Sequence, residues 1–271
     1  MHKTVVKTLF IIFQSIFMFA FANAQTKDTL VSVGNHMLNF RLIEGEGLPI
    51  VFESGGGNDG SVWLQVQSLL KEKINAPLIA YDRAGFGNSG LDTNRIDINN
   101  EVRDLALGLN TLGFRDGYFF VAHSLGGNYA MRFIANNPSK VKGAVFIDVV
   151  SPAYMTAERA RETKAGFMED IAEIKAESLG FYHLVLNYEH TSQVMRALAD
   201  SINLPMLVIG SGISPFEGEL RAEFIAGLKA FADARANRSY LLVSDAEHYV
   251  FYDKPNLVAD EIVKLYHSIL D

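Results

Sequence analysis

A serine at the end of a short apolar run is the first candidate for chemistry in this sequence. Ser124 closely follows the apolar run 118–121 and precedes two glycines and a helical pattern of apolar residues. In a sharp strand-to-helix turn a serine hydroxyl stands exposed, and small residues two positions before and after it let the strand and the helix approach closely. Here those positions hold Ala122 and Gly126. The pattern predicts a nucleophile at Ser124, whereas a serine that only caps the helix is the alternative.

A serine hydroxyl is a poor nucleophile until a base takes its proton, and the sequence holds seven histidines. His248 lies between the last apolar run and the last helical pattern, so it is the leading candidate for the base. His123 directly precedes Ser124, and alternation along a strand turns its side chain the other way, so we expect it to make a structural hydrogen bond. His183 and His190 lie in a helical segment from which they could contact a substrate.

The elements that must position these residues alternate in type along the chain. Helical spacing of apolar residues separates short apolar runs, so the sequence predicts an α/β fold with a mostly parallel central sheet and helices on both faces. Residues 28–43 are expected to form an antiparallel hairpin at one edge, turning at Gly34-Asn35. The runs are continuous, as is typical of strands buried on both faces, and occupy residues 50–52, 78–81, 118–121, 144–147, 206–209 and 240–243.

One segment, residues 151–201, interrupts this alternation. It contains no buried-strand run, and its mixture of methionine, aromatic and charged residues indicates helices. We expect a helical cap over the site, with the two parts of the core, residues 25–150 and 202–271, on either side; the alternative is a helical excursion that only packs on the core. The apolar residues of this segment suggest a substrate with an apolar acyl or alcohol group, although the same residues could simply anchor the cap.

Several motifs together resemble those of the α/β-hydrolase superfamily. Residues 122–126 resemble its Gly-x-Ser-x-Gly turn, with Ala122 in place of the first glycine. Residues 82–89 resemble its Asp-Arg-x-Gly-x-Gly-x-Ser loop, residues 53–57 stand where it usually carries His-Gly, and residues 247–255 resemble its terminal histidine segment. The resemblance covers nearly all of residues 25–271. It implies a serine nucleophile, a histidine base and an acid, with no metal and no organic cofactor.

The acid is the open position in this set. The superfamily's commonest acid follows the seventh strand, where this sequence has no aspartate and its first acid, Glu217, comes late, after a proline. Some members carry the acid after the sixth strand, and here Asp148 ends the run 144–147. Catalytic groups gather at the carboxyl edge of such sheets, and the order Ser124, Asp148, His248 matches that of the superfamily. Asp148 is the leading candidate and Glu217 the alternative.

Acyl transfer also needs donors for the negative oxygen that develops in the transition state. The resemblance implies the backbone N–H groups of Leu125 and Gly56, the latter in the run of three glycines 55–57. A flexible turn is the alternative for this glycine run. Asp82 and Arg83 are interpreted as a structural ion pair that shapes the loop above it.

The composition limits the chemistry further. The chain has 271 residues and no cysteine, which excludes disulfides, thiolate catalysis and cysteine-based zinc sites. Its formal net charge is −7, so no nucleic-acid partner is expected.

The first 24 residues resemble a secretory signal. Lys3 and Lys7 precede an almost wholly apolar stretch, and Ala22-Asn23-Ala24 offers the small residues that a signal peptidase reads. Cleavage after Ala24 removes two lysines and no acid, so the net charge falls from −7 to −9. We expect export to the periplasm or the medium without a lasting membrane span; an uncleaved anchor is the alternative.

The sequence therefore predicts a serine hydrolase that cleaves a carboxylic ester of a small molecule through an acyl-enzyme intermediate. Lactone, amide or peptide, and carbon–carbon bond hydrolysis are alternatives within the same fold, and a ligand-binding protein with weak turnover is an alternative of another class. Halide and epoxide chemistry is disfavoured, because relatives with those activities use an aspartate where this chain has Ser124.

Overall fold

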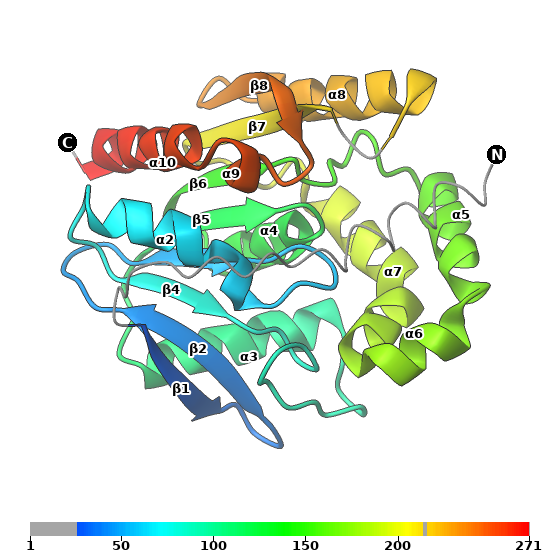
Figure 1. Ribbon diagram of the computed structural model, residues 1–271, viewed down its shortest axis with the longest axis horizontal. Helices are drawn as coiled ribbons and strands as arrows, with labels where there is room; N and C mark the ends of the chain where they lie inside the picture. Colours follow the sequence, from blue (N-terminus) through cyan, green and yellow to red (C-terminus); the bar gives the residue numbers. More distant parts are fainter. Residues whose placement is uncertain (1–25, 214–215, 271) are drawn as a thin grey trace.

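A single mostly parallel sheet organises the protein, as seen in a computed structural model that describes residues 26–213 and 216–270 (Figure 1). The predicted signal segment, residues 1–24, lies outside the described residues. The strands stand in the order β1-β2-β4-β3-β5-β6-β7-β8, so the chain crosses over between β3 and β4. Their bounds are β1 Lys27–Ser32, β2 Met37–Ile43, β3 Ile50–Glu53, β4 Leu78–Tyr81, β5 Tyr118–His123, β6 Val141–Ile147, β7 Met206–Ile213 and β8 Arg238–Glu247.

The predicted edge hairpin is confirmed. Strands β1 and β2 pair antiparallel, with Ser32 opposite Met37, and the turn between them contains Gly34 at a φ of 113°. That backbone angle lies in a region that glycine adopts without steric cost. Strand β2 also pairs antiparallel with β4, and every pair from β4 to β8 is parallel.

Each of the six continuous apolar runs forms a strand, but one of them is not buried on both faces. The run 240–243 lies in β8, which is the last strand of the sheet. Its Leu242 is exposed, whereas every residue of β5 is buried. The prediction of two buried faces is wrong for this run, because β8 has a neighbour on one side only and its residues are partly open to solvent.

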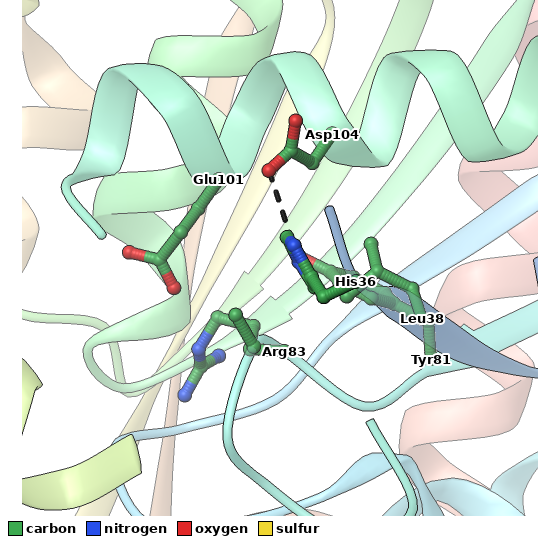
Figure 2. Close-up of a pocket in the computed structure, with 7 residues that line it drawn as sticks. His36, Leu38, Tyr81, Arg83, Glu101 and Asp104 are labelled. Atoms are coloured by element: carbon green, nitrogen blue, oxygen red, sulfur yellow. Dashed lines mark ion pairs between the residues drawn. The ribbon is translucent and has the colours of Figure 1, made fainter. Parts of the chain in front are cut away.

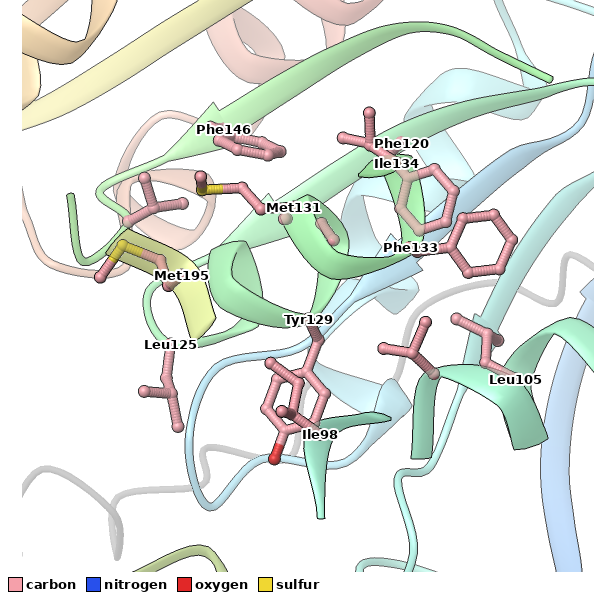
Figure 3. Packing of buried hydrophobic residues seen from close by; sticks show 14 of the residues in the cluster. Ile98, Leu105, Phe120, Leu125, Tyr129, Met131, Phe133, Ile134, Phe146 and Met195 are labelled. Carbon is pink, nitrogen blue, oxygen red and sulfur yellow. The ribbon is translucent and has the colours of Figure 1, made fainter. Parts of the chain in front are cut away.

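Helices cover both faces of the sheet and divide the core into two apolar clusters. Along β5, Phe120 and Ala122 join one cluster, while Phe119 and Val121 join the other. The helices of the core are α2 Leu64–Lys71, α3 Ile98–Thr111, α4 Gly126–Asn136, α8 Gly218–Asp233, α9 Val250–Asp253 and α10 Pro255–Leu270, with a short 3-10 helix η2 at Gly60–Trp63. The close-up of the first cluster shows α4 packed between the strand residues Phe120 and Phe146 and the α3 residue Leu105 (Figure 3).

The segment between β6 and β7 is helical, as predicted. It forms α5 Ala157–Met168, α6 Ile171–Glu177 and α7 Leu179–Leu198, which gather at the end of the sheet toward which the parallel strands point (Figure 1). Helix α7 approaches the loop after β4 closely, because a Cβ placed on Gly180 would lie only 2.6 Å from the carbonyl oxygen of Gly85. The Asn187 side chain also donates to the carbonyl of Ile96. The division of the chain into core and cap stays a prediction.

Candidate active site

Ser124 stands in a sharp turn between β5 and α4. Its φ is 53°, a left-handed value that a residue with a Cβ adopts only at a cost in conformational energy. The Ser124 N–H donates to the carbonyl of Ile147 at 3.1 Å, so strand β6 helps to hold the turn. A Cβ on Gly126 would lie 2.4 Å from the carbonyl oxygen of Ser54, which shows why the second position after Ser124 is glycine. The strained turn leaves the serine only half-buried at the end of the strand.

His248 connects Ser124 to Asp148. Its Nε2 lies 3.0 Å from Ser124 Oγ, and its Nδ1 lies 2.6 Å from Asp148 Oδ2. An ionised carboxylate only accepts hydrogen bonds, so the proton of a neutral His248 resides on Nδ1 and Nε2 is free to accept the serine proton. The histidine follows β8 directly, and its side chain is 15% exposed, while that of Asp148 is fully buried.

Asp148, and not Glu217, lies against the histidine. Asp148 follows β6 and has a φ of 46°, a left-handed value that aspartate tolerates better than most residues. Glu217 is exposed and precedes the first residue of α8, and none of the hydrogen bonds or ion pairs of the described residues joins it to His248. Of the two acids that the sequence leaves open, the structure brings Asp148 into contact with His248.

Ser211 is a member of this cluster that the sequence patterns do not single out. Its N–H donates to Asp148 Oδ1 at 2.8 Å, and its hydroxyl donates to Asp148 Oδ2 at 2.9 Å. It lies in β7, the strand that precedes the superfamily's commoner acid position. A polar residue closely following the apolar run 206–209 is the available signal, but its partner lies 63 residues earlier in the chain.

Two backbone N–H groups beside Ser124 lack an acceptor. Among the described residues, the N–H groups of Gly56 and Leu125 make no hydrogen bond. The glycine loop lies close to the serine, because a Cβ on Gly55 would be 3.3 Å from the Cβ of Ser124, and one on Gly56 would be 3.3 Å from the Leu125 side chain. Two unpaired donors next to a nucleophile can hold an oxygen that becomes negative during a reaction.

Known proteins share both this fold and parts of this sequence. A family model described as the alpha/beta hydrolase fold matches residues 49–179. The chain has the α/β-hydrolase fold. One curated relative, the uncharacterized protein YqjL of Bacillus subtilis strain 168, is 23% identical over 227 residues, which cover 78% of this chain and 81% of the relative.

Solved structures share the fold across almost their whole length. A bromoperoxidase from Bacillus anthracis superimposes with a TM-score of 0.70 at 16% identity and covers 89% of this chain and 100% of its own. A thermophilic esterase from Thermogutta terrifontis, in a malate-bound structure, gives a TM-score of 0.63 at 20% identity and covers 91% of this chain and 99% of its own. At these identities the likeness shows a common fold.

A second histidine, His123, lies behind His248 and makes a structural hydrogen bond. The His123 Nε2–H donates to the backbone carbonyl of His248 at 3.1 Å, and the two rings lie 4.5 Å apart. Burial lowers the pKa of His123 well below its usual value, and the nearby His248 lowers it further. A neutral imidazole in this place holds the backbone of His248, in keeping with the structural hydrogen bond that we expected. The other two histidines considered, His183 and His190, lie on α7, where His190 is 3.4 Å from the Asn99 amide.

The interpretation of Asp82 and Arg83 as an ion pair with each other is wrong. Asp82 pairs with Arg41 at 2.7 Å, and it also accepts the N–H groups of Gly60 and Asn88. Arg83 pairs with Glu53, also at 2.7 Å. Neighbouring residues in an extended segment point in different directions, so each finds its partner in another strand. Both residues are still buried and hold loops, and the buried Glu53 at the end of β3 takes part in this network.

Residues 26–213 and 216–270 contain no group of three or more His, Asp or Glu side chains placed to hold a metal ion. Over the same ranges, none of the helices combines the length and the apolar character needed to cross a bilayer.

Proposed function

We propose that this α/β hydrolase cleaves a carboxylic ester through a serine acyl-enzyme intermediate. The observation that carries the proposal is the continuous hydrogen-bond chain from Ser124 Oγ through His248 to Asp148, with distances of 3.0 and 2.6 Å. A nucleophile, a base and a group that orients the base are the parts that acyl transfer requires, in the contacts that it requires. The fold that this chain shares with an esterase is consistent with this proposal.

Each residue then has a defined part in the reaction. Ser124 Oγ attacks the carbonyl carbon of the ester while His248 Nε2 takes the hydroxyl proton. The Gly56 and Leu125 N–H groups hold the carbonyl oxygen as it becomes negative, and Asp148 stabilises the protonated imidazole. His248 then gives the proton to the departing alcohol. Water repeats the sequence on the acyl-enzyme and releases the acid.

The decisive experiment removes the hydroxyl of Ser124. A Ser124→Ala variant should lose p-nitrophenyl ester turnover and covalent labelling by a fluorophosphonate, while its circular dichroism stays unchanged. Ser192→Ala is a matched control, because Ser192 is a fully buried serine on α7 whose hydroxyl has no hydrogen-bond partner among the described residues. Full turnover by the folded Ser124→Ala variant would overturn the proposal.

The environment of the serine supports a substrate with an apolar group. A Cβ on Gly56 would lie 3.9 Å from the Leu184 side chain of α7, so an apolar residue of the cap comes close to the proposed oxyanion loop. Several aromatic residues of the cap pack on one another instead: Phe167 lies 5.4 Å from Phe181 and 6.3 Å from Tyr188, ring to ring. These rings pack the cap, and Leu184, which lies near the glycine loop, is the cap residue that we propose to contact a bound acyl or alcohol group.

A substrate panel separates the ester reaction from its relatives. Esters of increasing acyl length, lactones, anilides and a carbon–carbon cleavage substrate would be compared by kcat/KM on wild type and on Ser124→Ala. We expect esters to be turned over fastest, with a preference for apolar acyl chains that weakens in Leu184→Ala. A higher kcat/KM for lactones or anilides would reassign the bond that is cleaved while leaving the serine mechanism in place.

A further inference from the structure

The buried guanidinium group of Arg83 binds the loop that carries Gly56. Arg83 Nη2 donates to the carbonyl oxygen of Gly55 at 2.6 Å, and Arg83 Nη1 donates to the carbonyl oxygen of Ser54. Both carbonyls belong to the segment between β3 and the proposed oxyanion donor. Arg83 is 2% exposed, so these bonds form away from competing water.

The bond to Gly55 has a consequence for the next N–H group. The carbonyl of Gly55 and the N–H of Gly56 belong to the same peptide unit, which is planar and trans in the described chain. In a trans peptide these two groups point in opposite directions. Fixing the carbonyl on Arg83 therefore fixes the Gly56 N–H within the same plane, pointing in the opposite direction, away from the guanidinium.

Arg83 is itself held on several sides. Its Nη1 pairs with Glu53 Oε1 at 2.7 Å, and the other oxygen of Glu53 accepts the Tyr81 hydroxyl at 2.5 Å. Its guanidinium lies 4.9 Å from the ring centre of Tyr129, on the helix that follows Ser124. Figure 2 shows this guanidinium on the loop after β4, together with Glu101 of α3, around a small pocket. The arginine thus connects β3, β4 and α4 at one point.

We propose that Arg83 is a positioning residue that orients the Gly56 N–H toward the oxyanion by binding the carbonyl groups of Ser54 and Gly55. The inference rests on the proposed serine mechanism and adds a residue that touches neither the substrate nor the reacting atoms. Arginine suits the task because its planar fork donates from two nitrogens in fixed directions, whereas lysine offers one compact charge. Loss of this fork should weaken binding of the transition state more than binding of the substrate.

The test replaces the fork while keeping the charge. In Arg83→Lys the ammonium can still pair with Glu53, but it cannot bind both carbonyls in the same geometry. Removal of one oxyanion donor costs on the order of 100-fold in kcat in other hydrolases, so a misdirected Gly56 N–H should lower kcat by about 10- to 100-fold with little change in KM. The matched control is Arg238→Lys. Arg238 is also a buried arginine that donates to two backbone carbonyls, those of Phe231 and Ile202, but it opens β8 at the end opposite to His248.

A change of substrate atom provides a readout that general destabilisation does not move. An aryl thionoester carries sulfur in place of the carbonyl oxygen, and sulfur is a weak hydrogen-bond acceptor. Wild type should prefer the oxygen ester strongly, and the ester-to-thionoester ratio of kcat/KM should fall about 10-fold in Arg83→Lys but not in Arg238→Lys. If Arg83→Lys does not fold, Glu53→Gln/Arg83→Met removes the pair without leaving an unpaired buried charge and is assayed in the same way.

The outcomes separate this inference from the proposed function. A folded Arg83→Lys or Glu53→Gln/Arg83→Met variant that keeps the wild-type ratio and kcat would overturn the role of Arg83, even where Ser124→Ala is inactive. Ester turnover by Ser124→Ala would instead overturn the serine mechanism and this inference with it. A fall in kcat and in the ratio, confined to the Arg83 variants, supports the assignment.

Discussion

At the scale of single residues, the Asp148 carboxylate accepts a hydrogen bond from His248 Nδ1 and thereby sets which nitrogen of the imidazole carries the proton. Replacing it by asparagine keeps the shape but introduces an amide that can donate, which favours the wrong tautomer of the imidazole. We therefore expect Asp148→Asn to lower kcat/KM for p-nitrophenyl esters by about 1,000- to 10,000-fold. Glu217→Gln is the control and should stay within about twofold of wild type, because Glu217 is exposed and no hydrogen bond or ion pair of the described residues joins it to His248. A large loss in Glu217→Gln with an active Asp148→Asn would reverse the assignment of the acid.

Ser211 limits the freedom of the same carboxylate. Ser211→Ala removes the hydroxyl that donates to Oδ2 at 2.9 Å but keeps the backbone N–H on Oδ1. A hydrogen bond to a charged group is worth about 1.5–3 kcal/mol, and only part of that concerns the reaction, so kcat/KM should fall about 10-fold. The comparison with Ser192→Ala, a buried serine whose hydroxyl has no partner in the described chain, separates loss of this bond from loss of a buried hydroxyl in general. Equal kinetics for the two alanine variants would show that Ser211 does not position Asp148.

At the scale of elements, the packing of α3 against α4 partly buries a carboxyl group. Tyr129 on α4 donates its hydroxyl to Glu101 on α3 at 3.1 Å, and burial raises the pKa of Glu101 from 4.5 to about 7. A raised pKa means that the folded protein favours the protonated acid. The stability that this provides is complete below pH 4.5 and is lost as the pH rises through about 7. The loss amounts to about 2 kcal/mol when the partial exposure of the residue is taken into account.

The partly buried acid on α3 leads us to expect a pH-dependent gain in stability from Glu101→Gln. Glutamine keeps an oxygen that can accept the Tyr129 hydroxyl and has no proton to lose. Urea unfolding should therefore show the variant to be about 2 kcal/mol more stable than wild type at pH 8 and nearly equal to it at pH 5. Glu72→Gln, an exposed change just after α2, should show no such pH dependence. A difference between Glu101→Gln and wild type that is the same at both pH values would exclude titration of Glu101 as its cause.

At the scale of the whole molecule, helices and strands can be predicted from the sequence better than the contacts between side chains that are distant in the chain. Strands β3 to β7 could be recognised because a strand with neighbours on both sides and helices on both faces needs apolar residues throughout, as in the run 118–121. Ser124 and His248 could be proposed because each directly follows a strand. Asp148 could be named as the leading acid, but Glu217 stayed open as the alternative, and the partner of Arg83 was not predicted. Contacts such as that of His248 with Asp148 span 100 residues and depend on where the strands stand in the sheet.

If the predicted signal segment is cleaved, the remaining chain must still contain the strands of the sheet and the residues of the proposed site. Strand β1 begins at Lys27, so cleavage after Ala24 leaves all eight strands and every residue of the proposed site. We propose that the protein is exported and begins at Gln25. Mass spectrometry of the protein recovered from the periplasm of a Gram-negative host should give the mass of residues 25–271, with ester turnover equal to that of a chain expressed from residue 25. Ala24→Asp should block cleavage and retain the longer chain, since the peptidase reads a small residue there. Recovery of wild type as an intact, uncleaved chain would contradict the proposal.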